Sequence, residues 1–160
     1  TLTAVFAALC FAGTVFTKIN IFNGQGYVHF GDSVIFIAAC VLPLRYAIFV
    51  GAIGAGFADL ITGNAIWLIF TLVIKAVMAI GFNNKGLKII SLRNVLVSFV
   101  SSVVGIIGYY FAEVILFKNF ITPFVSALWG LIQLAGSIIA FAAIGLALDK
   151  MEFKRKIDNL

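Results

Sequence analysis

Apolar residues in this chain gather into long, nearly unbroken stretches that short polar turns separate. The stretches do not alternate apolar and polar residues at period two, which disfavours the strands of an outer-membrane barrel. Their lengths suit α-helices instead, because about 20 mostly apolar residues cross the hydrocarbon core of a bilayer. The pattern predicts six transmembrane helices, near residues 1–17, 31–43, 46–62, 65–82, 94–117 and 123–148.

The second and third stretches have the shortest connection, which consists of Pro43, Leu44 and Arg45. Proline ends a helix or kinks it, since it lacks the backbone N–H that the helix needs. The sequence therefore predicts either a tight hairpin at this point or one kinked pair of incomplete spans.

Composition indicates a membrane protein without a soluble domain. Of the 160 residues, 63% are hydrophobic and 11% are charged, which is more apolar surface than a soluble domain of this length buries. We interpret residues 1–160 as one all-α domain, a bundle of six transmembrane helices. The first stretch has no basic leader, so we expect a span and not a cleaved signal. Cys10 and Cys40 lie in apolar stretches without metal-ligand spacing and are interpreted as packing residues.

Positive charges divide unevenly between the two sets of turns. With both termini in the cytoplasm, the outer turns hold only Lys18 and Lys118. The inner turns and the tail then hold Arg45, Lys85, Lys88, Arg93, Lys150, Lys154, Arg155 and Lys156. The positive-inside rule favours this orientation. We expect the net charge of +5 to reflect orientation and contact with anionic headgroups, and we expect no nucleic-acid partner.

Four ionisable residues fall inside the apolar stretches: Asp32, Asp59, Lys75 and Glu113. A charge in hydrocarbon is costly, so each is a candidate functional group. Asp32 precedes an apolar run, and a helix N-cap explains it about as well as a substrate contact does. Asp59 and Lys75 are candidates for an ion pair that neutralises both. Glu113 has no partner in its own helix, which favours contact with a substrate or with another helix.

Further polar and aromatic residues lie toward the same, outer side of the predicted bundle: Tyr27, His29, Asn64, Trp67, Tyr109, Tyr110, Trp129 and Gln133. The inner halves of the helices are nearly all Ala, Val, Ile, Leu and Phe. This asymmetry predicts a polar chamber that is open to the outside above an apolar floor, as a capture site for a small solute requires. A channel would need a polar lining through both halves. A lone histidine is a poor metal ligand set, so we expect no metal, and we identify no catalytic residue.

A stripe of alanines follows one face of the first predicted helix. Ala4, Ala8 and Ala12 are spaced four residues apart, and small residues at this spacing let another helix approach closely. Gly51 and Ala55 in the third predicted helix, and Gly105 and Gly108 in the fifth, are expected to serve internal packing. The alanine stripe is therefore a candidate docking face for a partner.

With these features the chain resembles the substrate-binding S component of energy-coupling factor (ECF) vitamin transporters. The resemblance covers nearly the whole chain and rests on the alanine stripe, on the loop Tyr27-Val28-His29-Phe30-Gly31-Asp32, and on two blocks. The first block runs from Gly54 to Gly63 (GAGFADLITG) and the second from Phe70 to Lys75 (FTLVIK). The loop is most similar to the subfamily that handles pyridoxine or hydroxymethylpyrimidine.

The resemblance implies a function that this chain shares with partners. An S component binds a vitamin from outside and associates with a membrane coupling subunit, the T component, and with two cytoplasmic ATPases. It implies docking through Ala4, Ala8 and Ala12, a toppling motion in the bilayer, and location in the cell membrane of a prokaryote. It also implies a structural or coupling role for Asp59 and Lys75. The residues that would bind substrate are Tyr27, His29, Asn64, Trp67, Tyr110, Glu113, Trp129 and Gln133.

The chemistry of these residues favours a small flat ring that bears hydroxymethyl groups, with Glu113 accepting a hydrogen bond from it. We expect no cofactor and no ATPase activity in this chain. Two other functions stay open. One is a stand-alone proton-coupled transporter that uses Asp59, Lys75 and Glu113 as a relay, although no inverted repeat of broken helices is evident. The other is a small membrane enzyme, for which a nucleophile or metal cluster is lacking.

Overall fold

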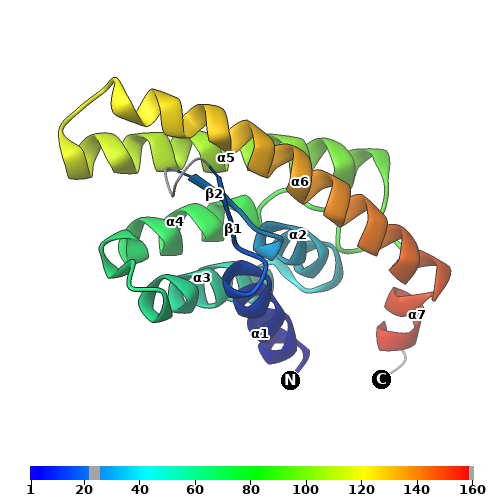
Figure 1. Cartoon of the computed structure of the whole chain (residues 1–160). Helices are drawn as coiled ribbons and strands as arrows, with labels where there is room; N and C mark the ends of the chain where they lie inside the picture. The colour runs from blue at the N-terminus through cyan, green and yellow to red at the C-terminus, as the bar shows by residue number, and fades with distance from the viewer. Residues whose placement is uncertain (22–25, 159–160) are drawn as a thin grey trace.

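A computed structural model of the chain describes residues 1–21 and 26–158, apart from the side chains of residues 20, 21, 26–28 and 158. The described part is a bundle of helices with one small antiparallel hairpin (Figure 1). Its elements are α1 (Leu2–Val15), β1 (Ile19–Ile21), β2 (Gly26–Val28), α2 (Gly31–Val41), α3 (Leu44–Ile61), the 3-10 turn η1 (Ala65–Trp67), α4 (Leu68–Met78), α5 (Leu92–Phe117), α6 (Thr122–Lys150) and α7 (Phe153–Asp158).

Each of the six apolar stretches contains a helix, but the helices differ in length. By length and composition, α3, α5 and α6 can each cross a membrane, whereas α1, α2 and the segment Ala65–Met78 are apolar but shorter. Some helices begin or end at other residues than predicted. For example, α5 begins two residues earlier than predicted because the Ser91 side chain accepts a hydrogen bond from the backbone N–H of Asn94. The hairpin and α7 were not predicted.

The connection at Pro43 is a tight hairpin, the first of its two predicted alternatives. Leu42 has an extended backbone, as the residue before a proline prefers, and α3 starts directly after Pro43. The two helices pack against each other, so α2 and α3 are separate elements and not one kinked helix.

Helix α3 lies between α1 and α4, and glycines allow the close approach on both sides. A Cβ atom on Gly51 would come within 2.7 Å of the Lys75 carbonyl oxygen in α4, and one on Gly54 within 2.8 Å of the Ala7 carbonyl oxygen in α1. In α5, added Cβ atoms at Gly105 and Gly108 would press on side chains of α4. The internal packing role predicted for Gly51, Gly105 and Gly108 is confirmed.

The apolar core is centred on α2. Phe36 of α2 stacks on Phe82 and meets Phe141 of α6 edge-on, with ring centroids 5.4 and 5.9 Å apart respectively. Cys10 and Cys40 are buried in the same cluster as free thiols, which confirms their interpretation as packing residues.

Both ends of the chain lie at the same end of the bundle (Figure 1). Gly13, near the end of α1, lies against Gly31 at the start of α2, so α1 and α2 are antiparallel. The start of α1 is therefore near the end of α2, and there Lys154 of α7 donates a hydrogen bond to the Cys40 carbonyl.

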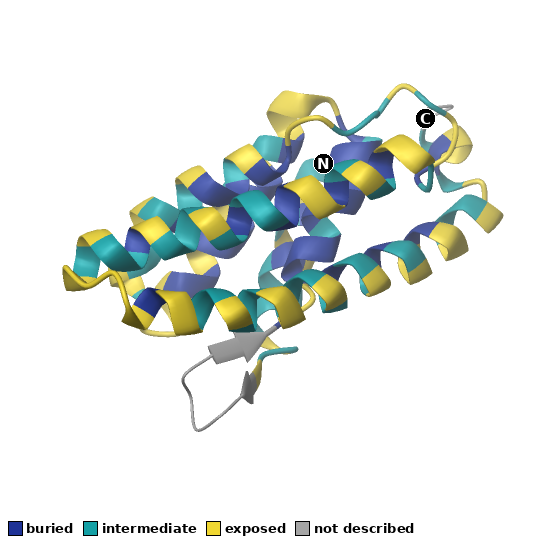
Figure 2. Cartoon of the chain, turned by 90° about the horizontal axis from the view of Figure 1, so that it is seen from above, coloured by how far each residue is buried: buried dark blue, intermediate teal, exposed yellow. Residues whose placement is uncertain are grey.

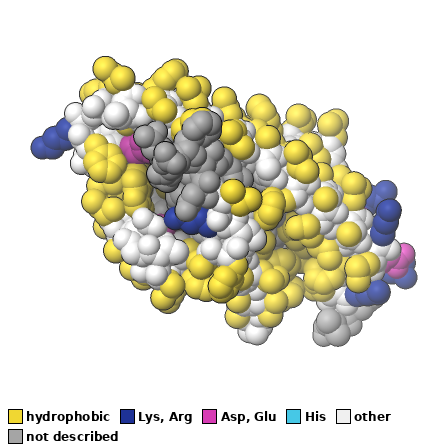
Figure 3. Space-filling view, viewed as in Figure 1, with side chains coloured by type: hydrophobic (Ala, Val, Ile, Leu, Met, Phe, Trp, Pro, Cys, Tyr) yellow, Lys and Arg dark blue, Asp and Glu magenta, His cyan; other side chains and the backbone are white. Residues whose placement is uncertain are grey.

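The outer surface of the bundle is apolar. Exposed residues run along the outward faces of the long helices and buried ones face inward (Figure 2), and hydrophobic side chains dominate the visible face (Figure 3). On α6, for instance, Leu131 and Ile139 are 53% and 69% exposed. A contiguous apolar surface of this extent suits contact with lipid chains and not with water.

Candidate functional site

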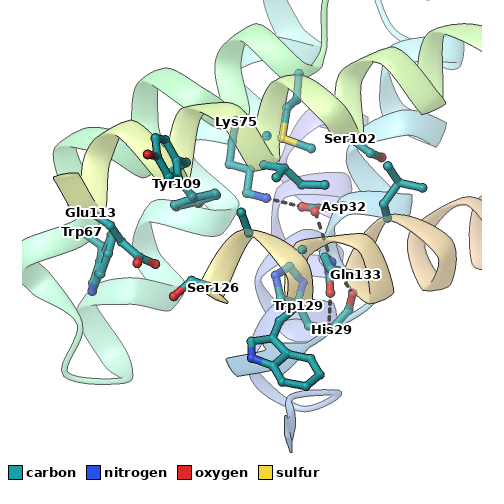
Figure 4. Close-up of a pocket in the computed structure, with 17 residues that line it drawn as sticks. His29, Asp32, Trp67, Lys75, Ser102, Tyr109, Glu113, Ser126, Trp129 and Gln133 are labelled. Carbon is teal, nitrogen blue, oxygen red and sulfur yellow. Dashed lines mark hydrogen bonds and ion pairs between the residues drawn. The ribbon is translucent and has the colours of Figure 1, made fainter. Parts of the chain in front are cut away.

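A cavity of about 270 Å³ lies among α2, α4, α5 and α6, beside the residue that follows the hairpin. Polar groups gather at two of its sides with Tyr109 between them (Figure 4), and Trp67 and Trp129 also line the cavity. We call the first group the buried cluster, which consists of His29, Asp32, Lys75 and Gln133. We call the second the Glu113 side, which consists of Tyr110, Glu113 and Ser126.

The buried cluster is built around an ion pair between two helices. Lys75 Nζ in α4 lies 2.5 Å from Asp32 Oδ1 in α2, and the residues are only 4% and 5% exposed. Lys75 is held there because Gly51 lets α3 pack directly on the backbone at Lys75. A charge that far from water needs its counter-charge at contact distance, which Asp32 provides.

Gln133 of α6 ties the cluster to the chain that follows the hairpin. Its Oε1 accepts a hydrogen bond from the His29 backbone N–H at 2.8 Å, and its Nε2 lies 2.9 Å from the His29 carbonyl oxygen. The same nitrogen lies 3.2 Å from Asp32 Oδ2 and 3.0 Å from Ser137 Oγ. One amide thus connects α6, α2 and the residue that follows the hairpin.

His29 lies between the hairpin and α2 and is buried at the edge of the cavity. Its Nδ1 accepts a hydrogen bond from the Gly31 backbone N–H at 3.1 Å, which requires that nitrogen to be unprotonated. Burial lowers the pKa of His29 to about 4. The side chain is therefore neutral at physiological pH.

The Glu113 side is formed by α5 and α6 near the turn that joins them. Glu113 of α5 and Ser126 of α6 both line the cavity, and their side chains point toward each other (Figure 4). Tyr110 also lines it, and its hydroxyl donates a hydrogen bond to the Phe120 carbonyl in the turn. The carboxylate of Glu113 thus faces the cavity from the side opposite to the buried cluster (Figure 4).

Aromatic side chains complete the lining of the cavity. Trp67 contacts Tyr109 with ring centroids 6.3 Å apart, and both line the cavity together with Trp129. Lys75 Nζ lies 5.3 Å from the centre of the Tyr109 ring. Walls of this kind suit a flat ring that stacks on aromatic faces.

Most of the predicted binding residues do line one cavity. These are His29, Trp67, Tyr110, Glu113, Trp129 and Gln133. Asn64 does not: it precedes η1, and its side chain donates to Thr62 Oγ1, because the 3-10 turn places it outside the cavity. Tyr27 pairs with Asn20 in the hairpin, and its side chain lies outside the described residues.

The structure corrects one prediction about the ionisable residues and decides between two alternatives for another. Lys75 forms its ion pair with Asp32 and not with Asp59, since α2 and not α3 presents a carboxylate to its ammonium. Asp59 is buried in α3, and its Oδ2 has no hydrogen-bond partner among the described residues. Of the two alternatives for Asp32, the N-cap is excluded, because α2 has no side-chain cap and both carboxylate oxygens of Asp32 are bonded to other elements. Asp32 does line the cavity, as a substrate contact would require.

Lys75 and Tyr109 were not among the predicted binding residues, but both line the cavity. Ser126 was missed altogether. The available signal was the depth of Lys75 within an apolar stretch. A buried lysine implies a buried acid nearby, but the identity of that acid depends on which helices meet.

A second, wholly apolar groove lies between α1 and α3. Ala7, Ala8 and Phe11 line it from α1, and Ile53, Gly54, Phe57 and Ile61 from α3. Ala4 and Ala8 of the predicted stripe are exposed and Ala12 is partly so. The stripe therefore faces outward beside a shallow depression.

Comparison with known proteins places this architecture among transporter subunits. A family model described as "ECF-type riboflavin transporter, S component" matches residues 1–150. A protein of Pyrococcus woesei, described as an uncharacterized protein in gap 3'region, is 32% identical over 106 residues. That match covers 65% of this chain and 70% of the other protein.

Proposed function

The chain belongs to the family of ECF-type riboflavin transporter S components, and from this premise we propose that its cavity captures a small vitamin-like ring compound. The observation that carries the proposal is the cavity itself. Six of the eight predicted binding residues line it, and they supply both its polar groups and its aromatic rings. The family is one of transporter subunits and not of enzymes, so the chain is a multi-pass membrane protein of the vitamin-capture class.

Within that class we propose a compact ligand such as pyridoxine or hydroxymethylpyrimidine. A cavity of about 270 Å³ is near the lower end of small-molecule sites, which run from roughly 300 to 1,000 Å³. A single ring with hydroxymethyl substituents is the appropriate size, and Glu113 faces it as a hydrogen-bond acceptor.

We further propose the membrane arrangement that this function needs. The helical segments cross the bilayer six times, both termini lie in the cytoplasm, and the cavity opens outward. The membrane is the cell membrane of a prokaryote. Energy enters through partners, which are a T component and two cytoplasmic ATPases, and the loaded subunit topples in the bilayer to release its ligand inside. Asp59 and Lys75 serve structure or coupling.

The decisive measurement is mass spectrometry of the compound that co-purifies with the protein, followed by titration with pyridoxine, hydroxymethylpyrimidine and riboflavin. We expect binding without ATP, with a single-ring compound preferred. Preferred binding of riboflavin would overturn the substrate proposed here, and binding of none of the three would overturn the capture function.

Transport tests the partners separately. We expect uptake into vesicles only when the T component and ATPases are present, and we expect Ala8→Phe to abolish uptake while leaving ligand affinity unchanged, because a large side chain blocks close helix approach. Unchanged uptake by this variant would reject the docking role of the stripe. Uptake by the chain alone with a proton gradient would favour a stand-alone transporter.

A further inference from the structure

The cavity contains a lysine whose charge is already neutralised. Lys75 and His29 are the basic side chains among the described residues that line it, and His29 accepts a hydrogen bond at Nδ1 as a neutral ring. Lys75 is therefore the single fixed positive charge among the described lining residues. Its ammonium has three N–H donors, of which one is directed to Asp32.

Asp32 lines the cavity, but both of its carboxylate oxygens are bonded to other side chains. One of its oxygens accepts from Lys75 at 2.5 Å and the other from Gln133 at 3.2 Å. Gln133 is itself fixed by two bonds to the backbone of His29. The carboxylate is thus oriented from both sides, and the ion pair persists as a unit with no net charge.

The remaining charge in the cavity is negative. Glu113 lines the opposite side, and with Lys75 neutralised by Asp32 the cavity has a net charge of −1 when both acids are ionised. An anionic ligand would enter a low-dielectric site whose described lining residues include no uncompensated cation, which is strongly unfavourable. A neutral ligand can still accept a hydrogen bond from the two other N–H groups of Lys75.

We propose that Asp32 is a specificity-determining residue that masks the charge of Lys75, so that the site takes neutral or cationic ring compounds and rejects their carboxylated or phosphorylated derivatives. This inference rests on the proposed capture function and adds the charge class of the ligand. It assigns to Lys75 the role of a hydrogen-bond donor and not that of an anion-binding group.

The test compares matched neutral and anionic probes. The first pair is pyridoxine and the carboxylate formed by oxidising one of its hydroxymethyl groups; the second is riboflavin and riboflavin phosphate. In the wild-type protein we expect the neutral member of a pair to bind at least tenfold more tightly. In Asp32→Asn, which uncovers Lys75, we expect the ratio to shift toward the anion by roughly 10- to 100-fold, as a gained charge-assisted hydrogen bond would produce.

Two variants serve as controls. Adding Lys75→Met to Asp32→Asn should remove the gain, because the uncovered cation is then absent. Asp59→Asn changes another buried acid that does not line the cavity, and the ratio should stay within about threefold of wild type. A thermal melt of each purified variant verifies folding.

Glu113→Gln keeps the test decisive even where Asp32→Asn does not fold. Removing the Glu113 charge should also favour the anion, but with the mask intact the neutral-to-anionic ratio should fall by less than about tenfold, below the shift expected for Asp32→Asn. A larger gain of anion binding in Glu113→Gln would assign selectivity to Glu113 and overturn the proposal. Equal wild-type binding of both members of a pair would also overturn it while leaving the capture function standing, whereas failure of pyridoxine, hydroxymethylpyrimidine and riboflavin all to bind would overturn both.

Discussion

Two buried polar regions of this bundle contain the same kinds of side chains but use them differently. At the end where the termini lie, Lys154 donates to the carbonyls of Cys40 and Asn84, and Asp149 accepts from the backbone N–H groups of Ile89 and Ile90. At the cavity, a lysine and an aspartate bond to each other. The first arrangement satisfies loop backbone, and the second leaves polar groups beside open space.

The difference lies in what the charged groups are bonded to. Backbone groups in the turn after α4 and at the end of α2 need partners once buried, and Asp149 and Lys154 fill that need together with Asn94, which accepts from Asn83 N–H and donates to the Ile89 carbonyl. A side chain used in this way stabilises the fold by satisfying buried backbone groups. Lys75 and Gln133 face a cavity, so a ligand can compete for or add to their hydrogen bonds.

The largest effect is expected from Asp149→Ala, which removes both acceptors of the Ile89 and Ile90 N–H groups. Each is a charge-assisted bond at a half-buried site, so the free energy of unfolding should fall by roughly 2–3 kcal/mol. Denaturation in detergent measures this loss. Ligand affinity of the folded protein should not change.

The matched control for that variant is Glu152→Gln. Glu152 lies three residues away and pairs with Arg155 on the surface, where an exposed ion pair contributes little. If Asp149→Ala and Glu152→Gln have the same free energy of unfolding, the backbone of the turn does not depend on Asp149. The proposed difference between the two polar regions would then be wrong.

An intermediate effect is expected from Gln133→Leu at the cavity. The substitution removes the amide that joins α6 to His29 and Asp32, so we expect ligand affinity to fall about 10- to 30-fold and the His29 amide to exchange faster with solvent. Titration calorimetry and hydrogen exchange measure these effects. Ser137→Ala, which removes only one of the Gln133 contacts, should change affinity less than about threefold.

The smallest effect is expected from Glu113→Gln. The amide keeps one acceptor oxygen but loses the charge, so the affinity for a hydroxyl-bearing ring should fall roughly 3- to 10-fold. Asn64→Ala is the control, because Asn64 does not line the cavity and its loss should leave affinity unchanged. Ligand titration measures both affinities. A larger loss of affinity in Asn64→Ala than in Glu113→Gln would indicate a binding site nearer to η1.

Much of the architecture was predictable because the bilayer imposes it. Long apolar stretches must be helical where lipid surrounds the backbone, and each of the six predicted stretches contains a helix. Polar residues that recur toward one side of those helices indicated a chamber, and His29, Glu113 and Gln133 do line a common cavity. The Pro43 turn was reduced to two alternatives by proline chemistry alone.

The hairpin and the ion-pair partners were not predictable in the same way. The strands at residues 19–21 and 26–28 have only three residues each, too few to give a clear period-two pattern, and their pairing is seen only in the folded chain. The choice of Asp32 over Asp59 as the partner of Lys75 depends on a distance between helices. A periodic pattern shows which face of a helix is apolar, but not which helix it meets.

The amino-acid sequence thus determined the class of protein, its helices, its packing glycines and the inventory of polar groups, since these follow from the local chemistry of each segment in an apolar solvent. Only the tertiary structure decided that Lys75 is neutralised by Asp32, that Gln133 fixes both to the hairpin, and that Asn64 is excluded from the cavity. The physical reason is that electrostatic and hydrogen-bond energies in a low-dielectric interior change steeply over a few ångströms, and those distances exist only once the helices have packed.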